Sequence, residues 1–147
     1  MVVENRDFES LIRQYDRPNT VFYCDPPYYE AEGCYAVGFP EGNHKRLHDV
    51  VMSSEGFFVI SYNYCDFIKE LYKDCYIFYT TRPNSMSQKA GSEYEEIVIT
   101  NYDPREYTAA RCWQLNMFGL PPVDEDDGKY ALIHDPTTNN SSEIMEE

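Results

Sequence analysis

Thr20-Val21-Phe22-Tyr23-Cys24-Asp25-Pro26-Pro27-Tyr28 is the stretch from which the fold can be predicted. Its first five residues are β-branched, aromatic or apolar and end at a double proline, which predicts a short buried strand over residues 20–24. Asp25 then lies at the carboxyl end of that strand. In open α/β sheets ligands bind beyond the carboxyl ends of parallel strands, so Asp25 stands where a functional residue is expected.

Helices and strands alternate along the chain around this stretch. Asn5 and Asn63 are predicted N-caps, each followed by apolar residues at helical spacing. The predicted helices cover residues 5–15, 43–53 and about 64–72, and the predicted strands cover residues 20–24, 57–62, 75–80 and 95–100. The last strand follows its neighbour too closely for a helical crossover, so it should return antiparallel. The sequence predicts an α/β fold with three parallel strands, an antiparallel terminal hairpin strand and flanking helices.

The rest of the chain is less regular. Residues 29–42 contain three glycines among several aromatic residues and are predicted to form a long ordered loop, a type of segment that is usually functional in compact domains. Tyr107, Ala110, Gln114 and Met117 favour one further helix within residues 104–121. Residues 122–147 combine four successive acidic residues with a Thr/Asn/Ser stretch, and we expect them to form a solvated, disordered tail.

The charge of the chain opposes nucleic-acid binding. The formal net charge is −14, whereas contacts to phosphate depend on Lys and Arg. Residues 122–147 hold eight acidic residues and one lysine, so this segment carries −7 and the remaining 121 residues carry the other −7. The sequence has no basic stripe with interleaved aromatic residues. We therefore expect the chain alone to be poorly equipped to grip a duplex.

The cysteines and the apolar segments indicate the compartment. Five cysteines without any Cys-x-x-Cys pair argue against both a disulfide framework and a zinc site. The N-terminal residues show no secretory signal, and no run approaches the ~18 apolar residues of a membrane span. These features favour a cytoplasmic protein with free thiols and no bound metal.

The four residues Asp25-Pro26-Pro27-Tyr28 suit chemistry on an exocyclic amine. The lone pair of an amine such as adenine N6 is delocalised into the ring, and in a duplex the amine is buried, so the base must be flipped out and the amine assisted. Asp25 can accept one N6 hydrogen, and the carbonyl of Pro26 or Pro27 can accept another. Tyr28 offers a ring face to the flipped base, and such stacking contributes ~1–3 kcal/mol per base.

The chain resembles the Dam-type N6-adenine-specific DNA methyltransferases, in the form found in phages and mobile elements. The resemblance covers roughly residues 5–103 in the family's order. It rests on residues 22–28 and on five further segments: Gly33-Cys34-Tyr35-Ala36-Val37-Gly38-Phe39, His44-Lys45-Arg46-Leu47, Ser61-Tyr62-Asn63, Arg82-Pro83-Asn84 and Glu96-Ile97-Val98-Ile99-Thr100-Asn101-Tyr102. Asn43 and Tyr64 depart from the family pattern, which has acidic residues there.

This resemblance implies a partial Rossmann-like methyltransferase sheet, S-adenosylmethionine as methyl donor and DNA as substrate. It implies catalytic roles for Asp25, Pro26, Pro27 and Tyr28, with Asp25 contacting both the donor and the target amine. Phe39 is expected to help bind the donor. The substrate-binding residues that the resemblance implies are Tyr28, Ser61, Tyr62 and Asn63. His44, at the start of a predicted helix, is expected to cap that helix or lie at the surface.

The family's glycine-rich donor loop and target-recognition region have no counterpart before Asn5, so we expect residues 1–103 to be the catalytic half of a methyltransferase domain. The strand over residues 20–24 would then have an exposed edge. We expect a second polypeptide to supply the donor-binding half, or self-association through that edge. Two other functions stay open: a non-catalytic remnant that acts by binding a partner, and an RNA base methyltransferase, which residues 33–39 and the Ile-Thr-Asn-Tyr ending disfavour.

Overall fold

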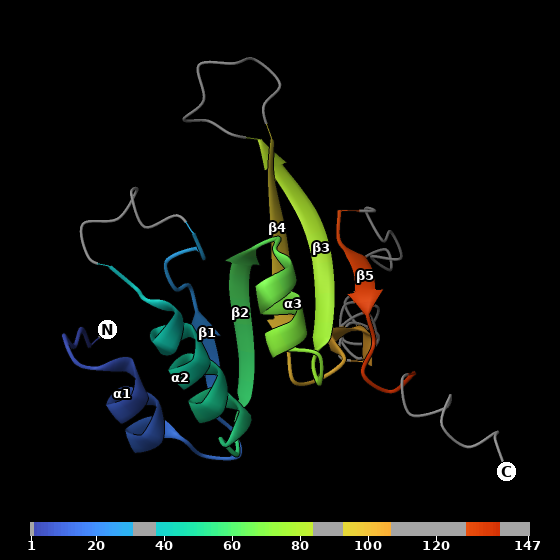
Figure 1. The fold of residues 1–147 in the computed structure, drawn as a ribbon. Coiled ribbons are helices and arrows are strands. Elements are labelled where there is room, and N and C mark those ends of the chain that lie inside the picture. Colours follow the sequence, from blue (N-terminus) through green and yellow to red (C-terminus); the bar gives the residue numbers. More distant parts are fainter. Residues whose placement is uncertain (1, 31–37, 84–92, 107–128, 139–147) are drawn as a thin grey trace, which may run out of the picture.

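The computed structural model describes residues 2–30, 38–83, 93–106 and 129–138. A five-stranded sheet runs through these residues in the order β1-β2-β4-β3-β5, and three helices lie in front of it in Figure 1. The elements are α1 (Phe8–Tyr15), β1 (Val21–Cys24), α2 (Glu41–Met52), β2 (Phe57–Asn63), α3 (Asp66–Leu71), β3 (Tyr76–Pro83), β4 (Glu93–Thr100) and β5 (Ala131–His134).

The strand order corrects the predicted sheet in one respect. β1 and β2 pair in parallel, with Val21 opposite Phe57 and Cys24 opposite Ile60. β4 is antiparallel, as predicted, but it lies between β2 and β3 and pairs with both. β2 and β3 therefore run in the same direction without touching, and the three predicted parallel strands form only one parallel pair. The α/β class is confirmed.

β5 is a second correction. The segment 122–147 was expected to be a disordered tail, but its residues 131–134 pair antiparallel with β3, with Leu132 opposite Phe78. This expectation is wrong for these residues, because an alternating pattern of only four residues carries too little signal to predict a strand. Residues 104–106 are helical, and the rest of the helix predicted within residues 104–121 lies outside the described residues.

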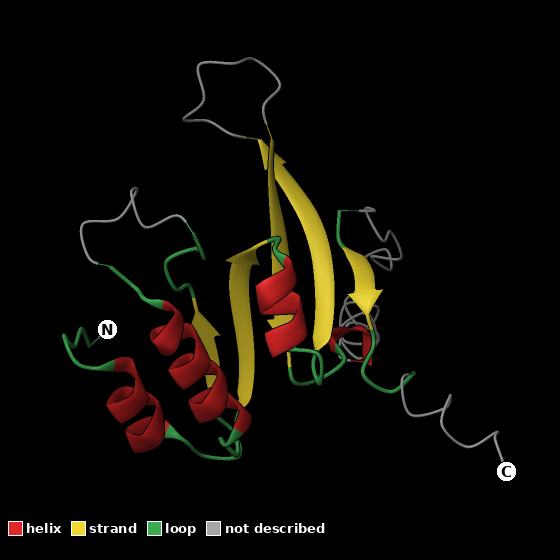
Figure 2. Cartoon of the chain, in the orientation of Figure 1, coloured by secondary structure: helices red, strands yellow, loops and turns green. Residues whose placement is uncertain are grey.

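The core lies between the sheet and the helices. In β2, Phe58, Ile60 and Tyr62 are fully buried. Tyr62 contacts both His44 of α2 and Tyr72 at the end of α3, so these two helices cover the same face of the sheet, as Figure 2 shows. Because side chains alternate along a strand, Val59, Ser61 and Asn63 belong to the opposite face.

Two predicted helix caps are wrong. α1 is capped by Asp7, whose Oδ2 accepts a hydrogen bond from the Ser10 amide at 3.2 Å, so Asn5 lies outside the helix. α3 follows Cys65, and Asn63 is still part of β2. Each predicted start is displaced by two residues, a usual error for helix ends inferred from sequence.

Gly56 lets the chain enter β2 next to the start of β1. Its amide donates to Asp16 Oδ1 at 3.1 Å, and its carbonyl accepts a hydrogen bond from Asn101 Nδ2 at 3.0 Å. A Cβ atom at this position would lie 2.7 Å from the Thr20 carbonyl oxygen and 3.0 Å from that of Arg17. Backbone atoms cannot retreat as a flexible side chain can, so this position requires glycine.

We expect Gly56→Ala to lower the free energy of unfolding by about 1–3 kcal/mol, the usual effect of forcing atoms into a filled space. Chemical denaturation followed by circular dichroism measures it. Gly42→Ala in α2 is the matched control, because no atom lies within 4 Å of its added Cβ, and stability should be unchanged or slightly raised. Equal stabilities of the two variants would contradict the close approach of β1 and β2 at Gly56.

The pairing of β5 with β3 generates a second prediction. Leu132 is half-buried and lies opposite Phe78, whereas its neighbour Ile133 is exposed. Leu132→Asp should therefore lower the melting temperature by several degrees, since a shift of about 4–8 °C corresponds to 1 kcal/mol in a small domain. Ile133→Asp makes the same chemical change on the other face and should have little effect. Two identical melting curves would show that β5 does not contribute to stability.

Candidate active site

Asp25 follows the last paired residue of β1, beside Ser61 of β2. Cys24 is opposite Ile60, so continuing the register by one residue brings Asp25 next to Ser61. The Ser61 hydroxyl is buried in the sheet and donates a hydrogen bond to Asp25 Oδ1 at 3.0 Å. Asp25 itself is exposed. The neighbouring strand therefore holds this carboxylate in place while leaving it accessible to solvent.

The two prolines that follow interrupt the pairing of β1 with β2. Proline has no amide hydrogen, so Pro26 and Pro27 cannot donate to a strand ladder. The side chain of Asn63 makes the next connection instead: its Oδ1 accepts from the Tyr29 amide at 2.9 Å, and its Nδ2 donates to the Tyr29 carbonyl at 3.1 Å. The Asn63 amide group, expected at a substrate contact, therefore binds the backbone of Tyr29, directly after the motif Asp25-Pro26-Pro27-Tyr28.

Tyr28 reaches across the sheet to β4. Its hydroxyl donates to Glu96 Oε1 at 2.5 Å, and Glu96 Oε2 forms an ion pair with Arg82 Nε at 2.7 Å. Glu96 is buried, with 7% of its surface exposed. Glu96 is not among the site residues predicted from the sequence. The signal available was an acidic residue directly before the apolar run Ile97-Val98-Ile99 in a predicted strand, since buried carboxylates are rare unless they are paired.

A cluster of aromatic rings supports the motif from the helix side. Tyr62 is 0% exposed, and its hydroxyl lies 2.8 Å from Nδ1 of His44, which is also buried. The His44 ring makes edge contacts with Phe39 and Tyr29, at centroid distances of 4.7 and 5.5 Å. His44 therefore neither caps α2 nor lies at the surface, and Tyr62 belongs to the core. Burial raises the pKa of Tyr62, so its hydroxyl stays protonated.

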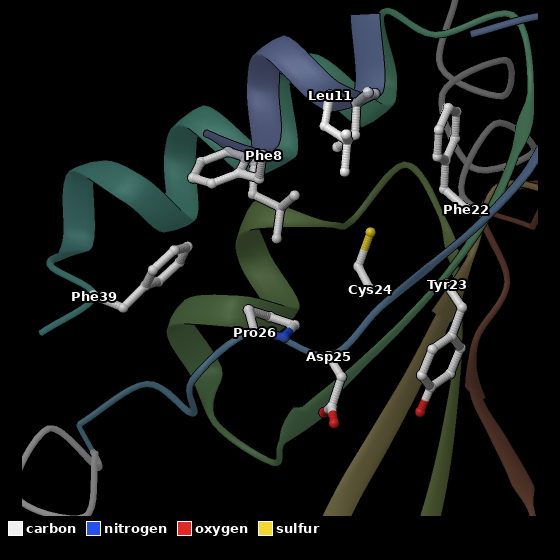
Figure 3. A pocket seen from close by; sticks show the side chains of 10 residues that line it. Phe8, Leu11, Phe22, Tyr23, Cys24, Asp25, Pro26 and Phe39 are labelled. Atoms are coloured by element: carbon white, nitrogen blue, oxygen red, sulfur yellow. The ribbon is translucent and has the colours of Figure 1, made fainter. Parts of the chain in front are cut away.

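A cavity of about 270 Å³ lies next to Asp25, between β1 and the helices. Figure 3 shows Phe8 and Leu11 of α1 above it, Phe22 and Cys24 of β1 pointing toward it from below, and Phe39 at one side. Tyr23 and the Asp25 carboxylate point to the opposite side of the strand. The Phe39 ring also contacts Phe8, at a centroid distance of 5.7 Å. The residues that line the cavity are Phe8, Leu11, Ile12, Phe22, Tyr23, Cys24, Asp25, Pro26, Phe39 and Leu47.

The cavity walls are largely apolar, and Asp25 borders the cavity while its carboxylate is held by Ser61 on the other face of the sheet. Burial raises the pKa of the Cys24 thiol to about 11, so this side chain is neutral at physiological pH. Of the residues predicted for donor or substrate binding, Asp25 and Phe39 line the cavity, together with Pro26. Ser61 and Asn63 contact the motif from β2, Tyr28 contacts β4, and Tyr62 lies in the core.

Two further features concern metals and membranes. Within the part of the chain that the structure describes, no group of three or more His, Cys, Asp or Glu side chains is arranged to hold a metal ion. None of the helices in the described ranges has the length and apolar character needed to cross a membrane.

Comparison with known proteins identifies the family. The family model of the D12 class N6 adenine-specific DNA methyltransferases matches residues 1–90. No curated protein matches the chain. The matched region is more than half of the 147 residues, and it contains Asp25, Tyr28 and Phe39 as well as the β2 residues that hold the motif. The chain therefore belongs to the D12 class N6 adenine-specific DNA methyltransferase family.

Proposed function

We propose that this chain provides the catalytic half of an enzyme that transfers a methyl group from S-adenosylmethionine to adenine N6 in DNA. The observation that carries the proposal is the position of Asp25: an exposed carboxylate at the end of β1, fixed by Ser61 and placed at the rim of an apolar cavity. Strand ends of this kind are where α/β proteins bind their ligands.

The residues around the cavity fit part of the methyl donor. S-adenosylmethionine combines an aromatic base, polar groups and a sulfonium cation, and when bound it supplies an electrophilic methyl group. Phe39 offers a ring for the base, and Asp25 offers a carboxylate for polar or cationic groups. The cavity of about 270 Å³ is smaller than the ~300–1,000 Å³ of typical ligand pockets. These residues therefore form one wall of a donor site that other groups must complete.

On the other side of Asp25, the motif can receive a flipped adenine. Asp25 accepts one hydrogen of the N6 amine and the carbonyl of Pro26 or Pro27 accepts the second, which localises the nitrogen lone pair toward the incoming methyl group. Tyr28 stacks against the base. As N6 gains its methyl group it loses a proton, which the exposed Asp25 carboxylate can take up and release to water. Ser61 keeps the carboxylate in position throughout.

DNA binding needs cations beyond those that the first two helices present. Arg46 pairs with Asp7 and Glu9, both at 3.0 Å, and Arg13 also pairs with Glu9. These guanidinium groups are already neutralised, and the formal net charge of the chain is −14. We therefore propose that a second polypeptide contributes to DNA binding and completes the donor site.

The exposed edge of the sheet at β1 is a second argument for a partner polypeptide. In the described part of the chain β1 pairs only with β2, and its Val21 and Tyr23 side chains are 62% and 67% exposed. A strand edge with exposed apolar side chains favours pairing with another strand. The same features would suit a non-catalytic subunit that acts only by binding, and methyl transfer distinguishes the two functions.

The role of Asp25 is tested by Asp25→Ala. With the chain combined with its partner, we expect transfer of a labelled methyl group from S-adenosylmethionine to adenine-containing DNA to fall by a factor of about 10² or more, the range for losing a group that acts on the transferred proton. The melting temperature should stay the same, because the side chain is exposed. Asp74→Ala, an exposed carboxylate after α3, is the control and should keep full activity. Retained turnover in Asp25→Ala would remove the proposed role of the carboxylate.

The exposed edge is tested by Val21→Lys. In the absence of its partner the purified chain should self-associate, and a lysine on the edge strand should reduce this because charged side chains block strand pairing. Analytical ultracentrifugation over a range of concentrations measures the effect. Met52→Lys introduces the same charge at the end of α2 and should leave self-association unchanged. We also expect weak donor binding by the chain alone, so a monomer that binds S-adenosylmethionine at micromolar affinity would refute this part of the proposal.

A further inference from the structure

Glu96 is a buried carboxylate on β4, a strand that lies between β2 and β3. Its pairing partners are Asn63 of β2 and Thr80 of β3, so it lies on the same face of the sheet as Asn63. Only 7% of Glu96 is exposed. A buried carboxylate loses its hydration, and a well-packed apolar residue in its place is often equally stable or more stable. Stability therefore does not explain a glutamate at this position.

The two oxygens of Glu96 have different partners. Oε1 accepts the hydrogen bond from the Tyr28 hydroxyl at 2.5 Å, and Oε2 binds Arg82 Nε at 2.7 Å. The Glu96 carboxylate raises the pKa of Arg82, so the guanidinium stays charged. Arg82 therefore holds one side of the carboxylate, and the other side is directed at Tyr28.

Tyr28 is consequently fixed at both ends of its side chain. At the backbone, the preceding prolines restrict the chain, and Asn63 binds both polar backbone groups of the adjacent Tyr29. At the hydroxyl, Glu96 accepts its hydrogen. Because a tyrosine side chain has only two rotatable bonds before a rigid ring, anchoring both ends sets the position and the long axis of the ring. A phenolic O–H prefers to lie in the plane of its ring, so the hydrogen bond to Glu96 also favours one ring plane. A ring that receives a flat base needs such an orientation.

We propose that Glu96 is a positioning residue that holds the Tyr28 ring in the orientation at which the target adenine stacks. This inference rests on the proposed function for the identity of the base. Glu96 acts through the tyrosine hydroxyl and does not touch the substrate. It lies outside the segment that matches the family model, so its role is inferred from its contacts alone.

The experiment compares Glu96→Ala with Glu96→Gln, whose amide oxygen can still accept the hydrogen bond from Tyr28. Glu95→Ala is the matched control, because Glu95 is the neighbouring glutamate and accepts a hydrogen bond from Tyr79 at 2.8 Å on the other face of β4. The first readout is the NMR signal of the Tyr28 ring in protein labelled with ¹³C-tyrosine, assigned by its loss in Tyr28→Phe. The second is kcat and KM for methyl transfer to DNA.

In Glu96→Ala we expect the Tyr28 signal to move toward that of a solvated tyrosine. We expect kcat to fall by about tenfold to a hundredfold with little change in KM, since misplacement of a substrate-positioning group by about 1 Å has an effect of that size. In Glu96→Gln both the Tyr28 signal and kcat should stay close to those of the wild type. Glu95→Ala should shift the NMR signal of Tyr79 and leave both the Tyr28 signal and kcat unchanged. Adding Tyr28→Phe to Glu96→Ala should reduce kcat no further than Tyr28→Phe does alone.

An unchanged Tyr28 signal in Glu96→Ala would overturn the inference, as would failure of Glu96→Gln to restore the signal. The signal is measured without substrate, so this decision does not depend on the proposed function. If the wild-type chain with its partner transfers no methyl group to adenine, the proposed function fails, and the signal still decides whether Glu96 orients Tyr28.

Discussion

The site depends on a change of partner where β1 ends. Two successive prolines remove two backbone donors, so the parallel ladder with β2 stops at Cys24. A segment that left the sheet without further contacts would be mobile. Instead, Ser61 binds Asp25 and Asn63 binds the backbone of Tyr29, so alternate side chains of β2 extend the connection over residues 25–29. The motif leaves the sheet and is still fixed by it.

This arrangement also explains why the site has two differently built sides. On the helix side of the sheet, Phe39, His44 and Tyr62 pack as aromatic rings beside an apolar cavity. On the opposite side the contacts are polar and charged, and they involve Ser61 and Glu96. Asp25 lies at the boundary, between a wall suited to an apolar or aromatic ligand and a framework that holds Tyr28. Its carboxylate is held on the Ser61 side, and its place at the end of β1 brings it next to the cavity.

The parts of this structure that follow from local sequence were predictable. The apolar run before the double proline located β1 and placed Asp25 at its end, and the short link after β3 made β4 antiparallel. Strand order was not predictable, because the insertion of β4 between β2 and β3 depends on pairing between residues far apart in sequence. For the same reason the contact of Glu96 with Tyr28, 68 residues apart, was missed. His44 was misplaced because its burial comes from rings on three other segments, and a lone histidine gives no sign of them.

The position of β4 has a consequence for biosynthesis. The ribosome delivers β1, β2 and β3 before β4, yet β2 and β3 are joined in the sheet only through β4, which pairs with both. A nascent chain that ends before residue 93 already contains Asp25 and Tyr28 but lacks the strand that carries Glu96. Contacts between distant residues form slowly, so β2 and β3 are joined only after β4 has been made. The joining of β2 to β3 through β4 and the assembly of the site are therefore one event, and until then the unpaired strands are available to chaperones or to other nascent chains.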